Sequence, residues 1–288
     1  MITGTFDYHR PADLSEAVGL LSRLDSDARV IAGGHSLIPM MKLRFASPSH
    51  LVDLAAIAEL KGVRRDGDEI VIGAMTTQHE ILADELLAGL APILKEAAAQ
   101  IADPQVRYMG TIGGNVANGD PGNDMPGVMM ALDASYVLRG SGGERRVAAR
   151  DYYKGAYDTA ASPGEILTSI RFAVPPAKHG YAYEKLKRKV GDYATAAAAV
   201  ILSVADGKIA TCAIGLTNVA DTALFAKDAA AAVVGRPLDK AGLAIAAVAA
   251  EAITSPAADG RGSAEYRTKM AGVMTARALS RAFARATA

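Results

Sequence analysis

Two short loops decide the fold of this 288-residue chain, namely Ala32-Gly33-Gly34-His35-Ser36 and Thr111-Ile112-Gly113-Gly114-Asn115. Each loop sets two adjacent glycines beside a small polar residue. Glycines let the backbone approach a ligand and take positive φ, so successive N–H groups can converge on phosphate oxygens. The hydroxyls of Ser36 and Thr111 can add donors. One double glycine after a strand is more often only a tight turn. The two loops together favour a phosphate cradle.

Neither loop matches the known nucleotide fingerprints. The chain shows no G-x-G-x-x-G and no G-x-x-x-x-G-K-[ST] at these positions, so a Rossmann or NTPase fold has no positive support. Asp120 and Asp124 follow the second loop and could accept hydrogen bonds from ribose hydroxyls. Turn formation in a Pro/Gly loop explains the same aspartates more simply, and the residues alone favour that explanation.

A third feature is the basic segment Lys185 to Lys189, which is followed by Gly191-Asp192-Tyr193. Taken alone, this segment is typical of a solvated edge strand. A lysine held near a flavin could stabilise the anionic reduced ring, and a tyrosine could cover the ring face. The fold would have to bring these residues to the two loops.

Composition excludes several functions. The 31 basic and 31 acidic residues cancel, which argues against nucleic-acid binding. A single cysteine, Cys212, cannot form an intramolecular disulfide, an iron-sulfur cluster or a cysteine-based zinc site. The longest apolar stretch, 194–205, is shorter than the roughly 20 residues of a membrane span. The N-terminus lacks the features of a signal peptide, so we expect a cytoplasmic protein.

The first two thirds of the chain predict two mixed α/β units. Asp13 and Glu16 are spaced as a capping box before an apolar helical stripe over 14–24. With strands near 29–34 and 50–54 this helix forms a first unit of roughly residues 1–56. The second unit is expected to contain strands 69–73, 136–139 and 166–174, helices 76–82, 90–101 and 127–132, and a Gly/Asn/Asp/Pro segment over 110–126.

Pro175-Pro176 marks the predicted boundary to the last third, because no regular element easily crosses two prolines. Asp206-Gly207 lies between two apolar runs and is a strong hairpin signal. Three alanine-rich helices are expected to follow, over 224–234, 240–253 and 264–286.

The order of these motifs resembles the FAD-binding subunit or domain of the xanthine dehydrogenase family of molybdenum hydroxylases. The resemblance covers nearly the whole chain. Three longer stretches, 101–115, 183–194 and 259–270, are similar to the medium subunits of the carbon monoxide dehydrogenase branch of that family.

This resemblance implies an α+β fold with a two-part FAD-binding domain over 1–177, divided into subdomains of about 1–56 and 57–177, and an α+β C-terminal domain over 178–288. It implies a non-covalent FAD and no catalytic or metal-binding residue in this chain. The FAD-contacting residues that it implies are Ala32, Gly33, Gly34, His35, Ser36, Thr111, Ile112, Gly113, Gly114 and Asn115 at the pyrophosphate, then Ile101, Asp124, Leu167, Lys185 and, covering the flavin, Tyr193.

The resemblance further implies a flavoprotein subunit that takes electrons from iron-sulfur clusters of a partner and passes them to a quinone-type acceptor. The implied partners are a small iron-sulfur subunit and a large subunit with a molybdenum-copper cofactor, assembled as a dimer of heterotrimers. Carbon monoxide would react on the large subunit, and the complex could lie at the inner face of the cytoplasmic membrane.

Three alternatives stay open. The chain could serve another molybdenum hydroxylase that acts on an aldehyde or an N-heterocycle. A stand-alone flavin oxidase is a second alternative, because a histidine beside a double glycine, as at His35, is where some oxidases attach their flavin. The third is a scaffold that keeps the fold without a flavin, which the retained glycine pairs and Lys185 disfavour.

Overall fold

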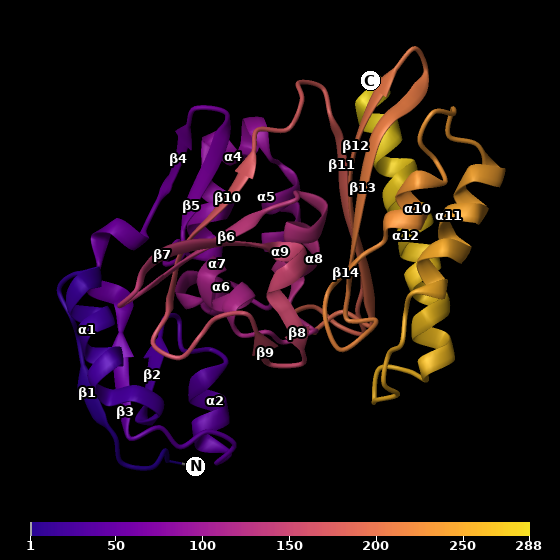
Figure 1. The fold of residues 1–288 in the computed structure, drawn as a ribbon. Coiled ribbons are helices and arrows are strands. Elements are labelled where there is room, and N and C mark those ends of the chain that lie inside the picture. The colour runs from indigo at the N-terminus through magenta and orange to yellow at the C-terminus, as the bar shows by residue number, and fades with distance from the viewer. Residues whose placement is uncertain (1) are drawn as a thin grey trace.

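The computed structural model describes residues 2–288. Its N-terminal part is a small α/β unit (Figure 1). Its parallel sheet has the order β1 (Asp7–His9), β3 (His50–Asp53), β2 (Ala28–Ile31). The helices of this unit are α1 (Leu14–Leu24), η1 (Asp25–Asp27) and α2 (Leu37–Lys42). Ala17, Val18 and Leu21 of α1 are buried in one core with Val52, as the predicted apolar stripe requires.

The predicted helix over 14–24 is confirmed, but its cap differs in detail. The Asp13 side chain accepts a hydrogen bond from Glu16 N at 2.8 Å. The Glu16 carboxylate accepts from Ala12 N at 2.7 Å rather than from Asp13 N, so the box is not reciprocal. A complete capping box occurs at Thr77 and Glu80.

A five-stranded antiparallel sheet forms the centre of the molecule. Its order is β4 (Val63–Asp66), β5 (Glu69–Gly73), β10 (Ile166–Ala173), β6 (Ser135–Gly140), β7 (Gly143–Ala148). The helices in this part of the chain are η2 (Leu54–Ala56), η3 (Ala58–Leu60), α3 (Gln78–Ala83), α4 (Glu85–Leu90), α5 (Ile93–Ala98), α6 (Pro104–Met109), α7 (Ile112–Ala117), α8 (Asp124–Ala131) and α9 (Ala149–Tyr152). A two-stranded sheet joins β8 (Tyr153–Gly155) to β9 (Asp158–Thr159).

The C-terminal part is a four-stranded antiparallel sheet backed by helices. The strand order is β11 (Gly180–Leu186), β12 (Ala196–Ala205), β13 (Lys208–Thr217), β14 (Leu224–Phe225), and the helices are α10 (Lys227–Ala231), α11 (Lys240–Ala252) and α12 (Ala264–Thr287). The hairpin at Asp206-Gly207 is confirmed, with positive φ at both residues. In Figure 1 this sheet stands between the central part and the helices α10–α12.

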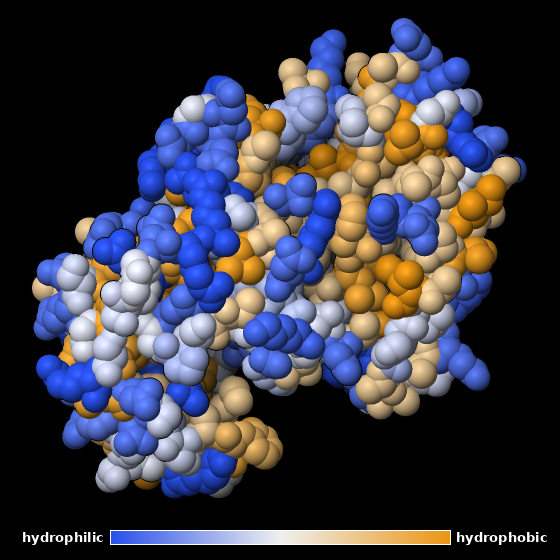
Figure 2. Space-filling model, viewed as in Figure 1, coloured by the Kyte–Doolittle hydropathy of each residue, from blue (hydrophilic) through white to orange (hydrophobic). Residues whose placement is uncertain are grey.

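Strand alternation gives the C-terminal sheet two buried faces. Tyr183 points into the core shared with α5 and α8, whereas Ala182 points into the core shared with α11 and α12. The contact with α8 is close, because a Cβ on Gly215 of β13 would lie 1.9 Å from the carbonyl oxygen of Gly127. On the outside, Figure 2 shows hydrophobic residues gathered over the C-terminal helices, where Ile245 and Val248 are exposed.

Several predicted elements are wrong in extent. The helix expected over 90–101 is shortened to α5, which begins after Pro92 because proline lacks the N–H that a continuous helix needs; α4, which precedes it, was not predicted. The segment 110–126 was expected to be irregular but contains α7 and the start of α8. The helix expected over 224–234 is shortened to α10 behind the short strand β14, and α2 and α6 were not predicted.

Candidate functional site

The two glycine loops lie side by side. A Cβ on Gly33 would be 2.2 Å from the carbonyl oxygen of Met109 and 2.8 Å from Gly110 Cα, so the first loop touches the backbone that leads into the second. A Cβ on Gly114 would be 3.7 Å from Ala32 Cβ. The segments are far apart in the sequence, and the fold joins them into one surface.

The first loop offers free backbone donors. Within residues 2–288, the N–H groups of Gly33, Gly34, His35 and Ser36 donate to no backbone carbonyl. Gly34 has φ of +74°, a left-handed conformation that suits glycine. Successive unpaired N–H groups around a left-handed residue form a concavity that binds anions. This loop therefore has the geometry expected of a phosphate cradle.

The second loop differs from the expectation, because its N–H groups are already used. Gly113 N donates to Ala74 O at 2.9 Å, and Gly114 N donates to the Thr111 hydroxyl at 3.0 Å. Asn115 N donates to Thr111 O at 3.0 Å. A Cβ on Gly113 would lie 2.5 Å from Ala74 O, so this glycine is required by packing within the protein. Of the two glycines in this loop, Gly114 is the one with open space beside its Cα, because a Cβ there would meet Thr111 Oγ1 and Ala32 Cβ but no backbone atom.

Asp124 and Lys185 form a buried ion pair. The Lys185 Nζ lies 2.8 Å from Asp124 Oδ2 and also donates to Gln100 O at 3.1 Å. The Tyr183 hydroxyl donates to the other carboxylate oxygen, Oδ1. The two charged side chains are 1% and 6% exposed. Burial raises the pKa of Asp124, and the Lys185 ammonium opposes that rise. Both were expected to contact FAD, and here they contact each other.

The two other candidate polar residues near the second loop have structural partners. Asp120 accepts from Gly122 N at 2.9 Å and from the Tyr157 hydroxyl at 3.1 Å, which is the turn role that the residues alone favoured. The Asn115 side chain accepts from Met125 N at 3.2 Å and thereby ties α7 to α8.

Tyr193 lies against the segment between α7 and α8 and is 43% exposed. Its ring rests on Gly122, where a Cβ would be 2.8 Å from Tyr193 Cδ1. Tyr193 N donates to Asp192 Oδ1 at 2.9 Å, and Asp192 pairs with Arg188 at 2.8 Å. The Arg261 guanidinium lies 5.6 Å from the centre of the Tyr193 ring. Burial, followed by the charge of Asp120, raises the pKa of Tyr193.

The remaining candidates divide between core and surface. Ile101 and Leu167 are 7% and 8% exposed and belong to the central core. Gly191 lies close to Ala102, the residue after Ile101: a Cβ on Gly191 would be 3.4 Å from Ala102 O. His35 is exposed. The sequence analysis did not identify Gln100, Tyr183 or Arg261 as partners of the candidate residues. The one available signal was the alternation of β11, which places Tyr183 and Lys185 on the same face.

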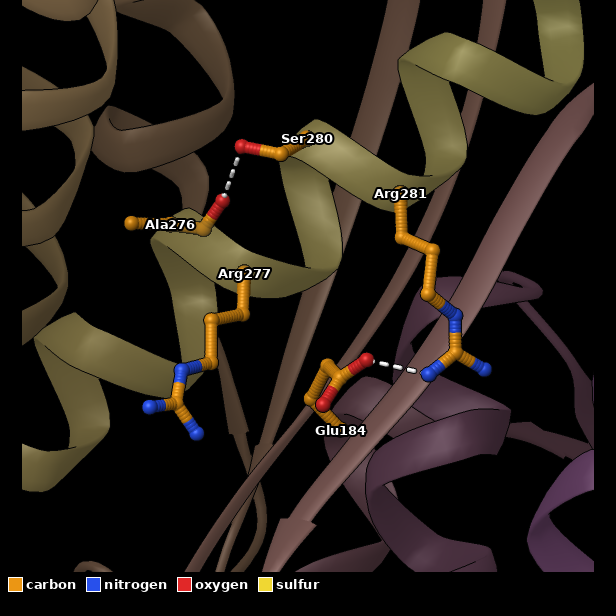
Figure 3. A pocket seen from close by; sticks show the side chains of 5 residues that line it. All are labelled: Glu184, Ala276, Arg277, Ser280 and Arg281. Carbon is orange, nitrogen blue, oxygen red and sulfur yellow. Dashed lines mark hydrogen bonds and ion pairs between the residues drawn. The ribbon is translucent and has the colours of Figure 1, made fainter.

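A groove of about 530 Å³ lies on the opposite face of β11 and contains none of the expected FAD residues. Figure 3 shows its lining residues Glu184, Ala276, Arg277, Ser280 and Arg281, with Arg281 joined to Glu184. Arg281 and Arg285 also pair with Glu96 of α5, which accepts a hydrogen bond from Tyr183 N at 2.9 Å. This network holds β11 against α5.

Over residues 2–288 we find no group of three or more His, Cys, Asp or Glu side chains that could hold a metal ion. Within the same range, no helix has the length and apolar character of a membrane span.

Comparison with known proteins identifies the family. Residues 4–175 match the FAD binding domain in molybdopterin dehydrogenase, and residues 181–282 match the CO dehydrogenase flavoprotein C-terminal domain. The chain is 63% identical over 286 residues to the carbon monoxide dehydrogenase medium chain of Afipia carboxidovorans, covering 99% of both chains. It is 36% identical over 275 residues to the glyceraldehyde dehydrogenase medium chain of Sulfolobus acidocaldarius, covering 95% of this chain and 96% of the relative.

A solved structure of reconstituted CO dehydrogenase from Oligotropha carboxidovorans superposes with a TM-score of 0.98 at 62% identity, covering 99% of this chain and all of that one. The chain therefore belongs to the FAD-binding subunits of the molybdenum hydroxylases. Within them it belongs to the carbon monoxide dehydrogenase medium-chain family and is an oxidoreductase subunit. The predicted family, fold class and FAD-binding domain are confirmed.

Proposed function

We propose that this chain is the flavoprotein subunit of a molybdenum-containing carbon monoxide dehydrogenase and binds FAD between its two glycine loops. The four free N–H groups of residues 33–36, set against the open position at Gly114, are the observation that carries this proposal. They supply donors and space for a pyrophosphate without a change in the protein's own hydrogen bonds. The 63% identity to a named medium chain supports the same function.

The residues have separate roles in this proposal. The backbone of 33–36 and the Thr111 hydroxyl bind the pyrophosphate, and Tyr193 covers one face of the flavin ring. Ile101 and Leu167 supply apolar contacts, and Lys185 and Asp124 supply charge near the ring. We propose the same division as the sequence predicts, with the FAD-binding domain at 1–177 and the C-terminal domain at 178–288.

FAD, when bound, accepts electrons and passes them on, which is chemistry that no side chain of this chain supplies. The single cysteine, Cys212, cannot hold an iron-sulfur cluster alone. We therefore propose that the electrons come from the clusters of a small partner subunit and that carbon monoxide reacts on a large molybdenum-copper subunit. A quinone-type acceptor, a dimer of heterotrimers and a cytoplasmic location stay predictions.

Another molybdenum hydroxylase is the second candidate. The glyceraldehyde dehydrogenase medium chain retains 36% identity over nearly the whole length, so the same subunit design occurs beside a different substrate. The substrate pocket lies on the partner in either case, and the partner's substrate distinguishes the two.

The experiment is reconstitution of the complex from its separate subunits. With this chain loaded with FAD, carbon monoxide is expected to bleach the flavin absorption and then to reduce a quinone-like dye. The same chain freed of FAD is the matched control and should leave the dye oxidised. Dye reduction at equal rates with and without FAD would overturn the proposed electron route, and dye reduction by an aldehyde but not by carbon monoxide would favour the second candidate.

A further inference from the structure

The charge of Lys185 is not free. Within residues 2–288 its ammonium has one carboxylate within 4 Å, that of Asp124, and it also donates a hydrogen bond to the neutral carbonyl of Gln100. Asp124 in turn has both oxygens engaged, one by Lys185 and one by the Tyr183 hydroxyl. The unit therefore contains one positive and one negative charge at 2.8 Å, with no net charge.

Solvent cannot screen this unit, because the two side chains are 1% and 6% exposed and Tyr183 is fully buried. Charges in such surroundings act over several ångströms more strongly than charges at the surface. A flavin near β11 thus experiences Lys185 and Asp124 together. A bare lysine would favour the reduced, anionic ring, and the aspartate offsets much of that preference.

We propose that Asp124 is the counter-charge that sets the reduction potential of the flavin, with Tyr183 as the positioning residue that holds the carboxylate on Lys185. This inference rests on the proposed FAD function. Without Asp124 the site would favour the reduced flavin and retain electrons. With Asp124 in place the potential stays lower, and the flavin remains able to reduce an external acceptor.

The placement of the pair supports this role. Asp124 begins α8 in the central part, whereas Tyr183 and Lys185 lie on β11 in the C-terminal sheet. The β11 backbone is fixed independently, since Tyr183 N donates to Glu96 at 2.9 Å and Tyr183 O accepts from Gln100 Nε2 at 3.3 Å. The distance between the charges is therefore set by the packing of two parts of the fold.

The test measures the midpoint potential of FAD bound to the isolated full chain in four proteins: wild type, Lys185→Met, Asp124→Asn and the double variant. We expect Lys185→Met to lower the potential and Asp124→Asn to raise it. Each shift should correspond to at least about a tenfold change in the ratio of the affinities for reduced and oxidised FAD, about 30 mV for a two-electron couple. The double variant should return close to wild type, since it has neither charge.

Asp133→Asn is the matched control. Asp133 lies just beyond the other end of α8 and pairs with Arg150 at 3.2 Å, but its side chain is 68% exposed, so its loss should leave the potential unchanged. Should Asp124→Asn fail to fold, Tyr183→Phe serves instead. Without the hydroxyl the carboxylate is held less firmly on Lys185 and offsets less of its charge, so the potential should rise, by less than in Asp124→Asn.

Shifts of the same sign in the two single variants would overturn the inference. An unchanged potential in Asp124→Asn, or in Tyr183→Phe if that variant must replace it, would overturn it as well. A wild-type chain that binds no FAD would instead refute the proposed function, so the two failures are distinguishable.

Discussion

Replacing Gly114 with alanine should weaken FAD binding and leave the chain stable, whereas the same change at Gly33 should destabilise the chain itself. At Gly33 the new Cβ would lie 2.2 Å from a backbone carbonyl oxygen, that of Met109. Backbone cannot rotate away as a side chain can, so the two loops must separate. Overpacking of this kind costs about 1–3 kcal/mol.

At Gly114 the new Cβ meets only the Thr111 hydroxyl at 3.0 Å and Ala32 Cβ at 3.7 Å. Gly114 lies inside α7, where alanine gains about 0.5–1 kcal/mol over glycine. The small contact and the helical gain offset each other, and the net change in the free energy of unfolding should stay within about 1 kcal/mol. The methyl group would, however, occupy the space proposed for the pyrophosphate. A loss of about 1.4 kcal/mol in binding is a tenfold weaker affinity.

The assay combines urea unfolding of the FAD-free chain with titration of FAD, followed by its fluorescence. Gly114→Ala should unfold at the wild-type urea concentration and bind FAD at least about tenfold more weakly. Gly33→Ala should unfold at lower urea. Normal FAD affinity in Gly114→Ala would refute the cradle, and wild-type stability in Gly33→Ala would refute the loop contact.

Three further outcomes are expected. Hydrogen bonds from Arg171 lower the pKa of Asp66 and Glu69, so these carboxylates stabilise the folded chain fully above about pH 4.5, and this stabilisation is lost as the pH falls through the lowered pKa values. Arg171→Leu should therefore reduce the urea midpoint more at pH 7 than at pH 3. An equal reduction at the two pH values would contradict this. Burial raises the pKa of Cys212 to about 12, so iodoacetamide at pH 8 should react roughly a thousandfold more slowly with the folded chain than with the unfolded chain. Equal rates would contradict the burial of this thiol. Acid precipitation should leave all FAD in the supernatant, whereas a yellow pellet would indicate covalent attachment at His35.

The sequence correctly predicted helices and hairpins whose ends are marked by local turn and capping residues. The Asp206-Gly207 turn fixes a hairpin because both residues adopt positive φ. The helix over 264–286 is found as α12 (Ala264–Thr287), since Ser263 caps it and no proline interrupts it. The same reasoning failed over 110–126, where glycine and asparagine disfavour a helix but packing of Gly113 against Ala74 supports α7.

The sequence pointed to individual candidate residues but not to the contacts that they make with one another. The sequence pointed to Asp124 and Lys185 separately, and it could not pair them, because they are 61 positions apart and lie in two parts of the fold. It also assigned all four loop glycines to the ligand. The structure adds that Gly33 and Gly113 also lie against neighbouring backbone, a close approach that no local pattern indicates.

Equilibrium binding of FAD to the purified, FAD-free full chain tests the central claim most directly. The account predicts saturable binding with one FAD per chain, competition by ADP, and full release of the flavin by acid. Pyrophosphate recognition at residues 33–36 requires the competition, because ADP carries the same diphosphate. A chain that binds no FAD, or that binds FAD with no effect of ADP, would contradict the account.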